Sequence, residues 1–314
     1  MKARLRPWRA LLVVLTASGL ALGAAAAAAA PGQPSAGSGV RAARAVAAPA
    51  ASTCDPKASS LSPSGPPQVT AGSFMAKIRA RGYLIAGVDQ STYHFGFLNP
   101  LTGQIEGFDI DMIKAVAKAI FGDPSKVQFK AISDEQRIPD VTDGTVDIVA
   151  HTMTITCARL RVVDFSSVYF DAHQRVLVLK NSTARSLSDL RGQKVCATKG
   201  STSIAAIVAH QAILVPVTYW TDCLVLLQQG DVAAISTDNT ILAGLAKQDP
   251  WTELIGPFIN NQPYGLAIAK QHTDFVAFVN AVLEQLRTDG QWAASYARWI
   301  GHPVPAPPPA LYAS

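Results

Sequence analysis

The sequence lacks the residue patterns that mark a metal site. None of its four cysteines forms a C-x-x-C pair, and none of its six histidines has the spacing of paired metal ligands. Structural and catalytic zinc sites depend on such fixed spacings of cysteine and histidine. We therefore expect neither a bound metal nor a cofactor.

An excess of positive charge is also missing from most of the chain. The formal net charge is +5, but residues 1–53 contain six of the 27 basic residues and no acidic residue. The remaining 21 basic residues face 22 acidic ones, and no basic stripe is interleaved with aromatic residues. Nucleic-acid binding requires a clustered positive surface, so we expect no nucleic-acid partner.

Both ends of the chain differ in composition from its centre. The basic residues Lys2, Arg4, Arg6 and Arg9 precede an apolar stretch that ends in small residues, which predicts a signal peptide at residues 1–30. The protein is then exported to the periplasm or cell envelope. The alternative is an uncleaved leader that tethers the protein, because the apolar stretch reaches the ~20 residues that span a bilayer. Residues 31–53, rich in alanine and proline, predict a disordered linker, and the proline-rich residues 302–314 a mobile tail.

The most informative segment is D-I-V-A-H-T-M-T-I-T-C-A-R, from Asp147 to Arg159. An apolar run of strand length leads into three alternating threonines and then one arginine, so hydroxyls, backbone amides and a guanidinium meet where a strand ends. Such a group suits a small carboxylate, and nothing nearby pairs a nucleophile with a base. The alternative is a structural arginine paired with Asp147 or Asp164.

The order of predicted elements indicates two α/β lobes. Strands and helices alternate in two sets, and this alternation is typical of βαβ units. The first set has strands at 83–88, 127–131 and 146–150, a helix at 109–121 and a short helix ending at Gly144. The second has strands at 194–198, 214–217 and 232–235, and helices after Gly200, at 221–229 and from Asn239.

The threonine and arginine segment resembles the ligand motif of the extracytoplasmic solute-binding proteins of ABC transporters, in the family that binds polar amino acids, family 3. In that family T-x-T-x-x-x-x-R ahead of D-F-S grips an α-carboxylate. Similar segments extend roughly over residues 74–301. They are Gly107–Asp111, Asp189–Val195, Gly200–Ser203, Ser236–Asp238, and Thr288–Trp292 with Trp299. The Cys54-Asp-Pro start and the run Asp238–Gly244 are most similar to the actinobacterial glutamine/glutamate-binding branch.

This resemblance implies a two-lobed α/β fold of the type II periplasmic-binding-protein class, with a hinge of two crossover strands. The crossovers are expected near 172–176 and 261–265. Lobe 1 would contain residues 54–171 and 265–301, and lobe 2 residues 172–264. Two C-terminal helices, 273–288 and 291–300, would return to lobe 1, with an apolar stripe in its core formed by Phe275, Phe278, Val279, Val282 and Leu286.

The four cysteines predict two disulfides in an oxidising compartment, and four cysteines allow three pairings. A protein that clamps a ligand must let its lobes rotate, so each disulfide is expected within one lobe. This condition favours Cys54 with Cys157 and Cys196 with Cys223.

The resemblance also implies which residues hold the ligand. Arg159, Thr154 and the backbone of Thr152 would bind the α-carboxylate. Asp238 would bind the ammonium, with a helix N-cap as its alternative or additional role. The segment Gly200, Ser201 and Thr202 would contact the ligand from the start of a helix, where anions and carbonyl oxygens are favoured.

Three further residues complete the predicted site. Phe95 and Phe97 would cover the aliphatic part of the ligand, with ordinary packing as an equal alternative. His151 would contact the ligand side chain, with a structural role as the alternative. The cationic neighbours Lys199 and Arg175 favour a ligand with a side-chain carboxylate or carboxamide, namely glutamate, aspartate, glutamine or asparagine.

The resemblance implies a monomeric binding protein, not an enzyme, that delivers this amino acid to the permease of an ABC importer by closure of its lobes. One alternative is a sensor domain for a signalling partner. A second is a dehydratase on the same fold, which needs a general acid or base, and no unpaired glutamate lies near the threonine motif. Neighbouring genes for a permease and an ATPase, or for a membrane regulator, would separate transport from sensing.

Overall fold

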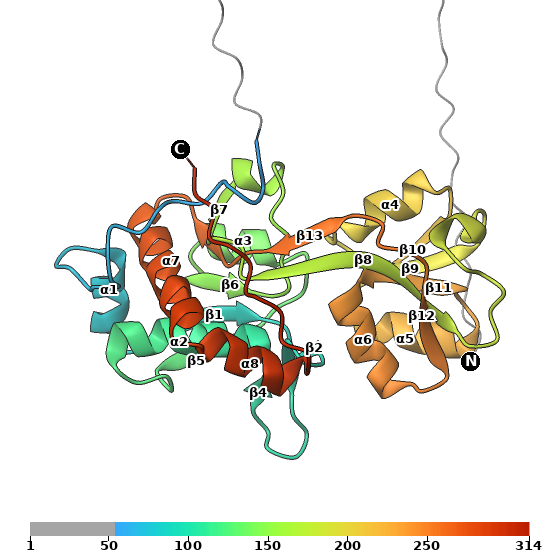
Figure 1. Ribbon diagram of the computed structural model, residues 1–314, viewed down its shortest axis with the longest axis horizontal. Coiled ribbons are helices and arrows are strands. Elements are labelled where there is room, and N and C mark those ends of the chain that lie inside the picture. Colours follow the sequence, from blue (N-terminus) through green and yellow to red (C-terminus); the bar gives the residue numbers. More distant parts are fainter. Residues whose placement is uncertain (1–53, 314) are drawn as a thin grey trace, which may run out of the picture. The chain divides into compact units, whose positions relative to one another are not determined.

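The computed structural model describes residues 54–313 of the chain (Figure 1). The predicted signal peptide at 1–30 and the predicted linker at 31–53 lie outside the described residues. None of the helices within residues 54–313 combines the length and apolar character needed to cross a membrane.

The first lobe is built on a five-stranded sheet with the order β5-β1-β6-β14-β7. The first three strands in this order are parallel, the fourth pairs antiparallel with the third, and the fifth pairs antiparallel with the fourth. Their bounds are β1 Leu84–Val88, β5 Val127–Ala131, β6 Ile148–Ala150, β7 Val163–Phe165 and β14 Ala267–Ala269. Strands buried on both faces of such a sheet need almost continuous apolar sequence, which β1 and β6 have.

Helices cover this sheet and complete lobe 1. They are α1 Phe74–Arg81, α2 Phe108–Phe121, α3 Arg137–Thr142, α7 Thr273–Thr288 and α8 Gln291–Trp299. The apolar stripe of α2 is buried and packs against α7, and α2 ends at Gly122, whose φ of 76° lies in the left-handed region that closes helices. The stripe predicted for α7 is buried in the same core, which confirms its predicted role. A small sheet of β2 Ser91–Thr92, β3 Gly96–Leu98 and β4 Ile105–Glu106 was not predicted.

The second lobe is built on a sheet with the order β10-β9-β11-β8-β12, in which β13 also pairs with β8. Strands β9, β10 and β11 are parallel, and β8 pairs antiparallel with both β11 and β12. The strands are β8 Phe170–Leu179, β9 Lys194–Thr198, β10 Ile213–Val217, β11 Ala234–Asp238, β12 Thr252–Ile255 and β13 Asn261–Tyr264. The helices are α4 Ser203–Ala209, α5 Trp220–Gln229 and α6 Asn239–Gln248.

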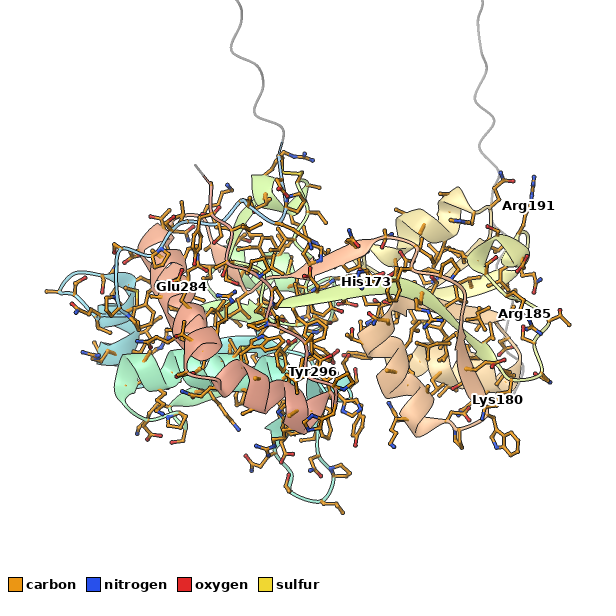
Figure 2. All side chains as sticks on the ribbon, viewed as in Figure 1. His173, Lys180, Arg185, Arg191, Glu284 and Tyr296 are labelled. Atoms are coloured by element: carbon orange, nitrogen blue, oxygen red, sulfur yellow. A yellow bond between two sulfur atoms is a disulfide. The ribbon has the colours of Figure 1, made fainter. Side chains whose placement is uncertain are left out.

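Two antiparallel strands connect the lobes, as predicted. The first half of β8 pairs with β13, from Phe170 with Tyr264 to His173 with Asn261 (Figures 1 and 2). Phe170 and Tyr264 belong to the hydrophobic core of lobe 1, whereas the second half of β8 contributes Val176 to the core of lobe 2. Strand β8 is therefore anchored in both lobes, and β13 pairs with the half of β8 that leaves lobe 1.

The proline-rich C-terminal segment differs from the expected mobile tail. Residues 302–313 pack against lobe 1, where the hydroxyl of Tyr312 donates to Glu284 of α7 at 2.6 Å (Figure 2 labels Glu284). Nε of Arg287 donates to the carbonyl of Pro308 at 3.1 Å, and the N–H of Ala313 donates to the carbonyl of Ser60 at 2.8 Å. Proline lacks an N–H but keeps its carbonyl acceptor, so a proline-rich segment can still be bound along a helix. The prediction of mobility was wrong for this reason.

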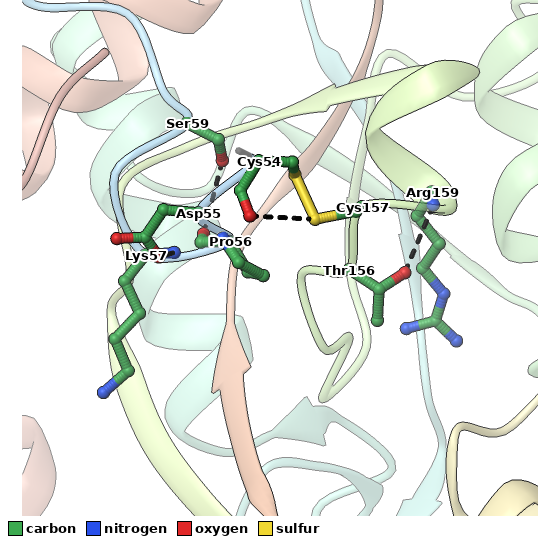
Figure 3. Close-up of a disulfide and its surroundings, with 8 residues drawn as sticks. All are labelled: Cys54, Asp55, Pro56, Lys57, Ser59, Thr156, Cys157 and Arg159. Carbon is green, nitrogen blue, oxygen red and sulfur yellow. Dashed lines mark hydrogen bonds between the residues drawn. A yellow bond between two sulfur atoms is a disulfide. The ribbon is translucent and has the colours of Figure 1, made fainter. Parts of the chain in front are cut away.

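The structure contains both disulfides with the favoured pairing. Cys54 and Cys157 are 6.0 Å apart at their Cα atoms, and Cys196 and Cys223 are 5.5 Å apart. The first attaches the N-terminal segment to the loop that carries Arg159 (Figure 3). The second joins β9 to α5 within lobe 2. Neither disulfide bridges the two lobes, which confirms the pairing expected for lobes that rotate.

We expect the double variant Cys196→Ala/Cys223→Ala to lose about 3.5 kcal/mol of unfolding free energy. The disulfide closes a loop with a sequence separation of 27 residues, and restricting such a loop in the unfolded chain stabilises the fold by about this amount. Urea unfolding of the oxidised protein and of the variant measures the difference. A loss below about 1 kcal/mol would show that this disulfide does not stabilise lobe 2 in the predicted way.

Candidate functional site

A small polar cavity lies between the two lobes, beyond the carboxyl ends of their parallel strands. This edge of an α/β sheet is where ligands usually bind. Lobe 1 lines the cavity with Asp134, Arg137, Thr152, Thr154 and Arg159. Lobe 2 lines it with Ser201, Thr202, Ser203, Trp220, Thr237, Asp238 and Ile241. Six of the ten predicted ligand residues therefore meet in one cavity, although they come from three separate segments.

Arg159 begins a short 3-10 turn at the end of the threonine segment and is only 9% exposed. Its Nη1 donates to the carbonyl of Thr154 at 2.6 Å, and its Nη2 donates across the cavity to the carbonyl of Gly200 at 3.0 Å. Its backbone N–H donates to the hydroxyl of Thr156 at 3.2 Å, next to the Cys157 disulfide (Figure 3). The guanidinium is thus held in place by neutral groups.

The alternative of a structural ion pair for Arg159 does not apply. Asp147 pairs with Arg81, and Asp164 pairs with Lys270 at 3.3 Å. Within residues 54–313, no carboxylate lies within 4 Å of the Arg159 guanidinium. Burial lowers the pKa of Arg159 to about 9, because the charged form loses hydration. Arg159 is therefore a buried cation without a counter-ion among the described residues.

The buried carboxylate of Asp109 holds the backbone of the threonine segment in place. Thr152 has a φ of 42°, which β-branched residues rarely adopt, and its N–H donates to Oδ2 of Asp109 at 2.8 Å. Oδ1 of Asp109 accepts from the hydroxyl of Tyr169 at 2.6 Å. Burial raises the pKa of Asp109 to about 6. The unusual backbone of Thr152 thus depends on a hydrogen bond from the first turn of α2.

Asp238 lies at the end of β11 and at the N-cap position of α6, and it is 3% exposed. Its Oδ2 accepts from the hydroxyl of Tyr264 at 2.7 Å. Within residues 54–313, Oδ1 has no hydrogen-bond partner and the side chain makes no capping bond. Burial is the main cause that raises the pKa of Asp238 to about 7. Asp238 therefore occupies the N-cap position of α6, but its carboxylate accepts from Tyr264 instead of capping the helix.

The segment Gly200–Thr202 contributes backbone and hydroxyl groups from lobe 2. Gly200 has a φ of 75°, and its carbonyl accepts from both Arg137 and Arg159. The hydroxyl of Thr202 donates to Oε1 of Gln262 at 2.8 Å, and the hydroxyl of Thr154 donates to the same atom at 2.6 Å. Gln262 of the crossover strand β13 therefore joins the motif loops of the two lobes.

Four predicted residues lie outside the cavity lining: Gly200, described above, and Phe95, Phe97 and His151. Phe95 packs in the core of lobe 1 against Phe170, with ring centroids 5.0 Å apart, and Phe97 packs against Trp299 at 6.0 Å. His151 is buried behind the cavity, where Nε2 contacts the carbonyl of Ile132 at 2.9 Å and Nδ1 lies 3.5 Å from Asp134. The two phenylalanines therefore have packing positions, and His151 has a structural one.

Sequence reasoning missed an ion pair in the cavity wall. Asp134 and Arg137 are 7% and 3% exposed, and Oδ1 of Asp134 lies 2.8 Å from Nη1 of Arg137. The hydroxyl of Thr198 donates to Oδ2 of Asp134 from lobe 2. Both charged residues follow the predicted strand at 127–131. Because ligand-binding residues often lie at the carboxyl end of a parallel strand, this position could have predicted them from the sequence. The sequence around Trp220 and Thr237 contains no feature of this kind.

Two α/β lobes joined by two crossover strands, with a charged cavity between them, define the class of two-lobed ligand-binding proteins. The chain belongs to the bacterial extracellular solute-binding proteins, family 3, which it matches over residues 84–302. The family and the type II two-lobed fold expected from the sequence are thus confirmed.

Known relatives agree with this assignment. The ABC transporter glutamine-binding protein GlnH of Bacillus subtilis is 39% identical over 229 residues, which cover 72% of this chain and 84% of the relative. The glutamine-binding protein of Geobacillus stearothermophilus is 41% identical over 204 residues, covering 64% of this chain and 78% of the relative. A solved structure of an ancestral arginine-binding protein bound to glutamine has a TM-score of 0.66 and 35% identity, covering 71% of this chain and 99% of that one. All three relatives are binding proteins by name.

Proposed function

We propose that this protein binds a free polar or acidic amino acid outside the cytoplasm and delivers it to the permease of an ABC importer. The ligand would be glutamate, aspartate, glutamine or asparagine. One observation carries the proposal: within residues 54–313, a single cavity holds a buried guanidinium without a counter-ion and a buried carboxylate oxygen without a hydrogen-bond partner. An α-amino acid carries the complementary carboxylate and ammonium on the same carbon atom.

The proposed contacts follow from the charges of these groups. Arg159 would exchange neutral carbonyl partners for the α-carboxylate, because charge-assisted bidentate bonds are stronger. Oδ1 of Asp238 would accept from the ammonium, which also needs uncharged acceptors for its other N–H groups. The hydroxyl of Ser201, which is buried without a partner among the described residues, is available for this purpose. We assign ligand contacts to Thr152, Thr154 and the segment Gly200–Thr202 on the same basis.

Closure of the lobes is part of the proposed mechanism. The hinge would lie in β8 and β13, which divides the chain into residues 54–171 with 265–301 and residues 172–264. The arginines of lobe 1 contact the carbonyl of Gly200 in lobe 2, so the two halves of the site are complete only when the lobes meet. We also propose that the leader at 1–30 exports the protein and is then either cleaved or kept as a tether. The protein would bind its ligand without catalysis, as supported by the binding proteins among its relatives.

Calorimetry of the purified, oxidised protein against the four amino acids tests the proposed ligand class. We expect at least one of them to bind with a stoichiometry of one. Small-angle scattering with and without saturating ligand tests closure, because rotation of one lobe changes the scattering profile. A protein that binds none of the four would contradict the ligand class, and an unchanged profile at saturation would contradict closure.

Gly200→Ala should weaken amino-acid binding by about tenfold, because it hinders closure. A Cβ at this position would lie 3.1 Å from the carbonyl oxygen of Asp134 and 3.2 Å from Cα of Glu135, both in lobe 1. Gly230→Ala is a matched control. Its φ is also 75°, but no atom of the described residues outside its immediate neighbours lies within 4 Å of the added Cβ. Equal losses of affinity in the two variants would show that backbone strain, not closure, is responsible.

A further inference from the structure

The cavity between the lobes contains two pairs of opposite charges, and the proposed function uses only one of them. Arg159 and Asp238 are assigned to the α-carboxylate and the ammonium. Asp134 and Arg137 remain, and both are more than nine-tenths buried in the same cavity wall. Buried charges are costly, so a second charged pair beside the ligand needs a reason.

The formal charges of these four residues sum to zero when both carboxylates are ionised. They lie close enough to act on one another, since the pKa of Arg159 is affected by Arg137, Asp134 and Asp238 in addition to its own burial. A ligand that brings no net charge keeps the buried cavity neutral. A ligand with a side-chain carboxylate would add one negative charge, and a ligand with a basic side chain one positive charge, in a region of low dielectric constant.

Arg137 is poorly placed to neutralise a side-chain carboxylate. Its charge is already balanced by Asp134 at 2.8 Å. Three of its five N–H groups donate to backbone carbonyls, those of Asp134 at 3.0 Å, His151 at 3.2 Å and Gly200 at 3.2 Å. A ligand carboxylate bound to Arg137 would lie next to the carboxylate of Asp134. Two neighbouring negative charges repel each other strongly in a buried site.

A carboxamide matches the pair in both of its groups. Its carbonyl oxygen can accept from a remaining N–H of Arg137, and its NH₂ group can donate to Asp134, whose oxygens keep free lone pairs beside the bonds to Arg137 and Thr198. A carboxylate has no N–H to donate. An apolar side chain would keep the charge balance but leave these buried groups without partners.

We propose that Asp134 and Arg137 are specificity residues that select an uncharged carboxamide side chain, glutamine or asparagine, over its carboxylate counterpart. This inference rests on the proposed function and narrows its ligand class from four amino acids to two. His151 lies behind Asp134, with Nδ1 3.5 Å from Oδ1, and helps to enclose the pair without lining the cavity.

Calorimetry at pH 8 with matched ligands tests the inference. The panel is glutamine against glutamate and asparagine against aspartate, because each pair has the same shape, with arginine and leucine as ligands of other character. We expect the better carboxamide to bind roughly ten times more tightly, or more, than its carboxylate counterpart, and arginine and leucine to bind more weakly than both. Tighter binding of glutamate or aspartate would overturn the inference while leaving the proposed function intact. Binding of none of the panel would contradict both.

The variant Asp134→Asn tests the role of the carboxylate directly. It removes one negative charge from the cavity with little change in shape, so the ratio of glutamine to glutamate affinity should shift roughly tenfold or more toward glutamate. Asp164→Asn is the matched control, because it makes the same change in total charge at a partly exposed ion pair with Lys270, outside the cavity, and should leave the ratio unchanged. Equal changes in both affinities in Asp134→Asn would show a structural role and overturn the inference. If Asp134→Asn does not fold, the ratio in the unmodified protein and in Asp134→Ser decides.

Discussion

Arg159→Ala is expected to abolish amino-acid binding while the protein stays folded. Arg159 is a buried cation without a counter-ion within residues 54–313, and the ligand carboxylate would be its charged partner. Removing one member of a buried charge pair costs about 3–5 kcal/mol, which corresponds to a loss of affinity from about a hundredfold to several thousandfold. The fold should persist, because the substitution deletes a desolvated charge whose partners are two backbone carbonyls. Calorimetry measures the affinity, and thermal unfolding measures the fold.

Two further variants make this experiment specific. Arg161→Ala changes an exposed arginine in the same 3-10 turn and should bind as the unmodified protein does. Arg159→Lys keeps the charge but loses the planar fork, so we expect weak binding between these extremes. Near-normal affinity in a folded Arg159→Ala variant would contradict the carboxylate assignment.

Asp238→Asn is expected to weaken binding by about a hundredfold or more. The substitution preserves shape and an oxygen that can accept from Tyr264, but it removes the negative charge opposite the ligand ammonium. Calorimetry measures the loss. Asp231→Asn, an exposed aspartate shortly before β11, makes the same charge change outside the cavity and should have no effect. Equal binding by the two variants would reduce Asp238 to a residue at the start of α6.

The affinity should also depend on pH through Asp238. Burial raises the pKa of this carboxyl group to about 7 in the free protein, and a bound ammonium would lower it. The free protein then binds more protons than the complex below about pH 7, so affinity should rise as the pH increases toward 7 and become constant above it. Titrations from pH 5 to pH 8 measure this change. In Asp238→Asn the rise near pH 7 should disappear, whereas a dependence that remains near pH 6 would come from Asp109, which lies behind Thr152.

Long periodic segments were predictable from the sequence, and short ones were not. Strands β5 and β9 and helix α7 have the predicted bounds, because each shows a clear apolar pattern over at least five residues. The short strands β2 and β3 carry no such pattern and are formed by pairing with each other. The C-terminal tail was misjudged because its binding partners, Arg287 and Glu284, lie on a helix whose position only the folded chain provides.

The sequence by itself determined the family, the two α/β lobes and the linear motif that ends in Arg159, because these depend on residues that are close together in the chain. Only the tertiary structure decided that Arg159 lacks a carboxylate partner within residues 54–313, that Asp238 faces the same cavity, and that Asp134 and Arg137 form a second charged pair there. These properties depend on distances between loops from different strands and on burial, which strengthens every charge interaction by excluding water. Neither quantity can be obtained from the order of residues alone.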